Sequence, residues 1–155
     1  MVTGFYPEPN YILASTASIA FLTVAAVAHW MVAWHHQVPL SFAIALSSIW
    51  FHTQRSYMAY LVDQTMILVW GCAVLYEAWR RGGIPMGIGT LGGLYIALIF
   101  YGGYLGQCYA FDPDRQLSTF YHALVHIVSF GSSVIILLLS PEPTLTTVKF
   151  VVSRQ

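Results

Sequence analysis

Residues 117–139, LSTFYHALVHIVSFGSSVIILLL, form an apolar run that contains two histidines and no Asp, Glu, Lys or Arg. An apolar run of about 20 residues has the length of a helix that crosses a membrane. Ser140 and Pro141 follow directly, and a proline cannot continue a helix. This stretch therefore predicts a transmembrane helix near the end of the chain.

Earlier in the chain, four more apolar runs predict helices of the same kind, at 11–34, 39–53, 58–79 and 85–108. Pro39 suits the first turn of the second. The fourth contains seven glycines, which let helix backbones approach closely in lipid. We expect an all-α integral membrane protein, a single domain over 1–155 with a bundle of about five transmembrane helices.

Composition excludes several other classes of protein. Hydrophobic residues make up 57% of the chain and charged residues only 8%, whereas a soluble domain carries about 25% charged residues. A cytosolic globular domain, a disordered tail and a nucleic-acid binder all need more charge than this. The many Trp, Tyr and Phe residues fit the aromatic belts of a membrane protein.

Five crossings place the two ends of the chain on opposite sides of the membrane. Met1–Asn10 contains no Lys or Arg, so we expect the first helix to be retained and not cleaved as a signal peptide. The positive-inside rule places the C-terminus in the cytoplasm or its equivalent and the N-terminus outside or in a lumen. Four basic residues are expected on the side of the C-terminus, namely Arg80, Arg81, Lys149 and Arg154, and two on the other side, Arg55 and Arg115.

Ionisable side chains inside a membrane helix cost about 2.5–3.5 kcal/mol each, so each one calls for an explanation. Glu77 lies near a helix end and is expected to pair with Arg80. His29 is expected to lie at the membrane interface, and His35 and His36 in a turn, so we do not expect these three to bind a metal. The ionisable residues that remain are His52, Asp63, His122 and His126.

These four residues are predicted to lie on one side of the membrane. His52 ends the second span, and Asp63 lies about one turn into the third. His122 and His126 are in the first turns of the last span, and their i, i+4 spacing puts both rings on one helix face. Ser48 shares the face of His52 for the same reason. Three spans thus bring a hydroxyl, a carboxylate and three imidazoles to one depth.

Three imidazoles match a catalytic zinc site, which has three protein ligands and an open fourth position. Zinc lowers the pKa of a bound water to about 7. Asp63 is then a candidate general base and acid, and Ser48 a candidate donor to an oxyanion. Two other interpretations stay open: the His-x-x-x-His pair packs against polar partners, or it ligates haem or chlorophyll.

This arrangement resembles the alkaline ceramidase branch of the CREST superfamily of membrane hydrolases. The resemblance rests on Ser48-Ile-Trp-Phe-His52, on Asp63 eleven positions later, and on His122-Ala-Leu-Val-His126. It differs from the family at Val125, where tryptophan is usual. The resemblance implies zinc held by His52, His122 and His126, with Asp63 and Ser48 in the catalytic roles above. It implies hydrolysis of the amide bond of a ceramide to a sphingoid base and a fatty acid.

The N-terminal Glu8-Pro9-Asn10-Tyr11 is similar to a calcium-binding segment of the ceramidases. Phe5-Tyr6 stands where the family has Asp-Trp, and the later acidic ligand falls near Ile19. Two carboxylates are missing, and a Ca²⁺ site needs several oxygen ligands. The resemblance therefore implies at most a reduced calcium site.

The chain is also shorter than the family, which has about seven spans. With one helix between Asp63 and the His-x-x-x-His pair where the family has three, it corresponds to a truncated seven-helix fold. Losing a pair of helices preserves the side of the membrane on which each residue lies.

A second function is open because the chain lacks helices that the family has. The chain is then a non-catalytic, ceramidase-like subunit that packs against other membrane subunits in a large respiratory or photosynthetic complex. Membrane lipids are the expected partners in either case, with a sphingolipid as the substrate of an enzyme.

Overall fold

The computed structural model describes residues 9–30, 37–54 and 56–139, and in this part of the chain the secondary structure is entirely helical. The elements are α1 (Tyr11–Trp30), α2 (Gln37–Gln54), α3 (Tyr57–Arg81), α4 (Gly83–Ala97), the π-helical turn η2 (Leu98–Gly102), α5 (Gly103–Gly106), the 3₁₀ turn η3 (Tyr109–Phe111) and α6 (Arg115–Leu138). The expected all-α bundle is confirmed.

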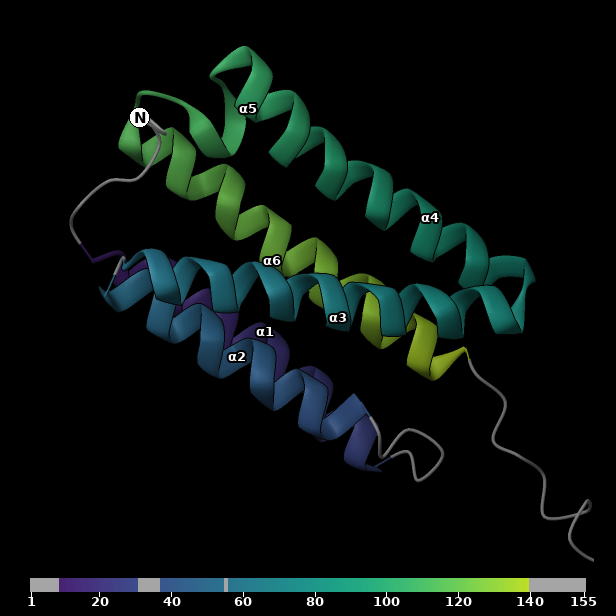
Figure 1. The fold of residues 1–155 in the computed structure, drawn as a ribbon. Coiled ribbons are helices and arrows are strands. Elements are labelled where there is room, and N and C mark those ends of the chain that lie inside the picture. The colour runs from purple at the N-terminus through teal and green to yellow at the C-terminus, as the bar shows by residue number, and fades with distance from the viewer. Residues whose placement is uncertain (1–8, 31–36, 55, 140–155) are drawn as a thin grey trace, which may run out of the picture.

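Consecutive long helices run in opposite directions and pack against one another (Figure 1). In addition, α6 packs against both α1 and α4, which closes the bundle into a ring. The end where α1, α3 and α6 begin is also the end where α2 and α5 finish. Residues far apart in the sequence therefore meet at this end of the bundle.

Local signals set the helix boundaries close to the predicted ones. Ser56 accepts a hydrogen bond from the Ala59 N–H and caps α3, and Asp114 caps α6 in the same way. The turn between α3 and α4 is shorter than expected, because Gly82 and Gly83 both have positive φ, which glycine adopts without strain. Residues 31–34 of the first predicted span lie outside the described residues.

Four helical segments in the described part of the chain are long and apolar enough to cross a membrane, namely Tyr11–Trp30, Tyr57–Arg81, Gly83–Gly106 and Arg115–Leu138. The protein is thus a multi-pass integral membrane protein. The second predicted span forms α2, an 18-residue helix outside this group of four. Its buried face includes Ser41, Ser47, Ser48 and His52, so α2 turns polar side chains into the bundle.

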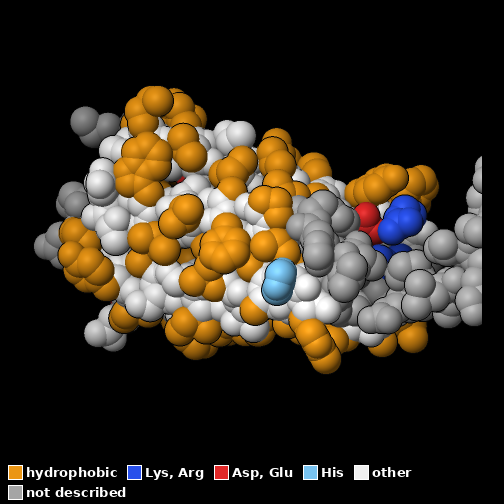
Figure 2. Space-filling view, turned by 90° about the horizontal axis from the view of Figure 1, so that it is seen from below, with side chains coloured by type: hydrophobic (Ala, Val, Ile, Leu, Met, Phe, Trp, Pro, Cys, Tyr) orange, Lys and Arg blue, Asp and Glu red, His pale blue; other side chains and the backbone are white. Residues whose placement is uncertain are grey.

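Large apolar side chains cover much of the outer surface. Figure 2 shows a face made mostly of hydrophobic side chains, with the Lys and Arg side chains in view gathered at one end. Leu68 and Tyr76 on α3, Leu91 on α4 and Leu98 on η2 are among the exposed large apolar residues of the molecule. A contiguous apolar surface of this kind is suited to contact with lipid.

Glycine brings α4 close to its neighbours at two positions. A Cβ atom on Gly89 would lie 2.9 Å from the Ala78 Cβ, and one on Gly92 would lie 2.7 Å from the Ser132 Oγ. The glycine-rich segment thus permits close contact of α4 with α3 and α6, as expected of small residues at membrane helix interfaces.

At the opposite end of the bundle from α6's first turn, the Glu77 carboxylate forms the expected ion pair. Its Oε2 lies 2.8 Å from the Arg80 Nη2 and 3.6 Å from the Arg81 Nη2. The prediction for Glu77 and Arg80 is confirmed, and Arg81 adds a second cation. This pairing accounts for a buried carboxylate in α3 without a catalytic role.

Candidate metal centre

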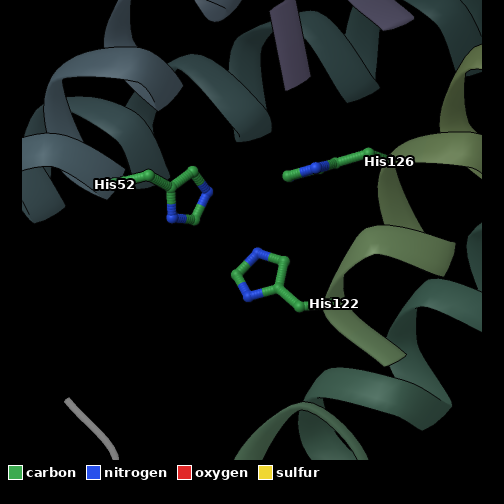
Figure 3. Close-up of side chains that lie close together, drawn as sticks. All are labelled: His52, His122 and His126. Carbon is green, nitrogen blue, oxygen red and sulfur yellow. The ribbon is translucent and has the colours of Figure 1, made fainter. Parts of the chain in front are cut away.

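Three imidazoles meet between α2 and α6. His52 lies in the last turn of α2, while His122 and His126 lie one turn apart in the first half of α6. Their rings face one another across the gap between the two helices (Figure 3). One ligand atom from each of the three lies within 4.8 Å of the others. The three histidines that the sequence selects are thus brought together.

The cluster lies inside the bundle. His52 is fully buried and His126 is 6% exposed, whereas His122 is half-buried. The ring centroids are 5.0 Å apart for His52 and His122, 5.5 Å for His52 and His126, and 5.1 Å for His122 and His126. Uncharged imidazoles can be buried in this way at a lower cost than charged groups.

The donor set fits zinc. Tetrahedral zinc with Zn–N bonds of about 2.0–2.1 Å places its ligand nitrogens roughly 3.4 Å apart. The three histidine nitrogens are within 4.8 Å of one another, so the imidazoles would have to turn toward one another to reach that spacing. Two ligands on successive turns of one helix and a third from a facing helix leave a fourth position for water or substrate, as in catalytic zinc sites.

Asp63 lies in the second turn of α3 and is 2% exposed. Its Oδ1 accepts hydrogen bonds from Ser48 Oγ at 2.7 Å and Ser47 Oγ at 3.0 Å. Both bonds go to the same oxygen, so Oδ2 accepts no hydrogen bond from the described residues. The hydroxyl hydrogen of Ser48 is committed to Asp63 in this arrangement, and Ser48 must rotate to donate to an oxyanion.

Ser47 and Thr16 belong to this region although the sequence analysis did not select them. Thr16 Oγ1 lies 3.0 Å from His126 Nδ1, and the Thr16 hydroxyl donates to the Leu13 carbonyl at 3.1 Å. A hydroxyl has one hydrogen, so as long as the Thr16 hydroxyl donates to the Leu13 carbonyl, His126 Nδ1–H is the group that can donate to Thr16. The lone pair of His126 is then on Nε2, the nitrogen left for a metal.

Asn10 ties the start of α1 to both helices that carry the histidines. Its backbone N–H donates to the His52 carbonyl at 2.8 Å, and its Nδ2 donates to Thr119 Oγ1 at 2.8 Å. Its Oδ1 accepts from the Leu13 N–H. The resemblance assigns Asn10 to a calcium-binding segment, but both polar atoms of its side chain bond to other residues of the protein. Glu8 lies outside the described residues.

The other histidines do not join the cluster. His29 is exposed and lies near the end of α1, about 20 Å along the helix axis from Thr16. His35 and His36 lie outside the described residues. Of the described part of the chain, the group formed by His52, His122 and His126 is the one with three potential ligands close together.

Comparison with protein-family models, with curated proteins and with solved structures found no match to this chain. The fold and the site nevertheless define a class. The chain is a multi-pass, all-α membrane protein with a largely buried cluster of three histidines between α2 and α6.

The hydrogen bond from His126 to Thr16 leads to a testable prediction. Thr16→Val keeps the shape of the side chain but removes the acceptor, and loss of such a supporting partner lowers metal affinity about 10–100-fold. Competition with a zinc chelator measures this affinity. Thr16→Ser should preserve it, and so should Thr23→Val, because the Thr23 hydroxyl donates to the Ile19 carbonyl of its own helix. Equal affinities in Thr16→Val and wild type would remove Thr16 from the site.

Proposed function

We propose that this protein is a zinc-dependent lipid amide hydrolase of the alkaline ceramidase type, which cleaves a ceramide-like lipid into a sphingoid base and a fatty acid. The observation that carries the proposal is the convergence of His52, His122 and His126 within 4.8 Å inside a membrane bundle. The resemblance in the Ser48, His52, Asp63 and His122-x-x-x-His126 pattern supplies the reaction.

A zinc ion at this site supplies Lewis acidity and lowers the pKa of water. His52, His122 and His126 hold the ion through one nitrogen each. Asp63 is the proposed proton carrier, because its Oδ2 accepts no hydrogen bond from the described residues while Ser47 and Ser48 fix its Oδ1. It takes a proton from water and returns it to the amine that leaves, so that water and amide give acid and amine.

Ser48 has two proposed tasks. Its short hydrogen bond to Asp63 orients the carboxylate in the resting protein. On rotation, the same hydroxyl can donate to the oxygen of the amide as negative charge develops there. Ser47 is the weaker partner of Asp63, because its Oγ also lies 3.1 Å from the Ile44 carbonyl and its one hydrogen is shared between the two acceptors.

The test uses the full chain purified in detergent. Metal analysis should find one zinc per chain and no haem or pigment. Ceramides of several chain lengths should release free fatty acid, and a zinc chelator should stop the release. The contrary result is that the protein binds zinc, shows no activity on any sphingolipid and co-purifies in a stable assembly with other membrane proteins. That result would overturn the proposed hydrolase and favour a non-catalytic subunit.

A further inference from the structure

Among the three clustered imidazoles, His122 has the most open surroundings. His52 and His126 are buried, whereas His122 is half-buried. His126 is also oriented by Thr16. A ring with more room has more rotamers available, so a packed neighbour can restrict the orientation of His122.

Phe100 is that neighbour. Its ring centroid lies 5.3 Å from the centroid of His122, with an angle of 84° between the planes. This is the edge-to-face geometry that aromatic pairs favour. Phe100 also meets Phe111 of η3 in the same geometry, at 5.9 Å and 85°. Phe100 is thus held between η3 and the histidine.

A local change of helix type sets the direction of Phe100. The residue lies in η2, a single π-helical turn between α4 and α5. Each residue of an α-helix turns about 100° around the axis, so the extra residue of a π-turn rotates everything beyond it. π-Helical turns are rare in proteins, and those that occur often lie at functional sites.

The packing around η2 leaves room for this turn against α6. Ile99 is buried in one apolar group with Val125 and Ala110. Val125 lies on α6 between His122 and His126 in the sequence, and Phe100 packs against the same apolar group. The π-turn is therefore packed against the part of α6 that carries His122.

We propose that Phe100 is a positioning residue: the π-helical turn η2 places its ring against His122 and holds that imidazole toward His52 and His126. The inference rests on the metal centre of the proposed function and adds a residue outside the ligand set. Phe100 acts through His122 and touches no metal.

The experiment compares Phe100→Ala with Tyr101→Ala. Tyr101 is the next residue in the same turn and is 77% exposed, so its loss leaves the contact with His122 in place. We expect Phe100→Ala to weaken zinc binding about 10–100-fold, as loss of a ligand's support does, and to change the visible spectrum of the Co²⁺-loaded protein. Tyr101→Ala should match the wild type in both. Phe100→Tyr should restore binding, and Phe100→Leu, which keeps apolar volume, should lie between.

A second measurement needs no metal. In the metal-free protein, the ring signals of His122 in NMR should be sharp in the wild type and Tyr101→Ala, and broadened in Phe100→Ala and Phe100→Leu. Loss of the Phe100 ring shifts the His122 signal by itself, so line width is the quantity to compare. A His122 signal that stays sharp in Phe100→Ala, together with unchanged zinc affinity, would overturn the inference. If the wild type binds no zinc, the proposed function fails, and the NMR comparison still decides the role of Phe100.

Discussion

His126→Ala should abolish zinc binding. His126 is one of three imidazoles within 4.8 Å of one another, and two ligands rarely retain zinc in competition with water. The zinc content should fall from one equivalent per chain to near zero. The variant should also lose the stabilisation that the metal gives to the folded state, which for a ligand present at 100 times its Kd is about 2.7 kcal/mol.

The measurement must separate loss of metal from loss of packing. His126 also contacts Phe21, with ring centroids 6.1 Å apart, and bonds to Thr16, so alanine lowers the Tm even without zinc. The quantity to compare is therefore the rise in Tm on adding zinc, which should vanish in the variant. His126→Gln serves as a second variant where alanine prevents folding.

His29→Ala is the matched control for His126→Ala. It removes an imidazole from α1 at an exposed position far from the cluster. Zinc content and the zinc-induced rise in Tm should equal those of the wild type. One zinc per chain in His126→Ala would contradict the ligand set, and so would loss of zinc in His29→Ala.

The sequence predicts the helices and the side of the membrane on which the polar residues meet. Both rest on strong signals, because apolar length defines a membrane helix and a histidine or aspartate within one is costly. His52 and His126 stand out in an apolar run for this reason. An even number of crossings separates Asp63 from the His122 region in the sequence, so counting spans is enough to bring them to one side.

Supporting residues give no such signal. Thr16 and Ser47 are small hydroxyl residues that usually bond to the carbonyl groups of their own helix. Only the packing of α1 against α6 and of α2 against α3 shows their other partners. Phe100 is one of many aromatic residues, and its role depends on a π-turn that the hydrophobic pattern does not encode. These residues are found from contacts between helices.

Asp63→Asn should abolish amide hydrolysis while leaving zinc in place. The asparagine keeps an oxygen that Ser47 and Ser48 can bond to, so the local packing of α2 and α3 is preserved. It removes the ability to take up and return a proton at neutral pH. Proton transfer by a positioned side chain contributes about 10²–10⁴-fold to rate, and we expect a loss of that size in kcat.

The comparison with zinc content distinguishes an enzyme from a packing subunit. Ser47→Ala is the control, because it removes one hydrogen bond to Asp63 while the 2.7 Å bond from Ser48 keeps the carboxylate in place. Its activity should fall far less than that of Asp63→Asn. If Asp63 serves only to join α2 and α3, the Asp63→Asn variant should keep the turnover and the zinc content of the wild type. In that case Ser47→Ala should lower the Tm and change nothing else. A wild type no more active than Asp63→Asn on every sphingolipid tried would assign the carboxylate to structure, because a proton carrier cannot be replaced by an amide without loss of rate.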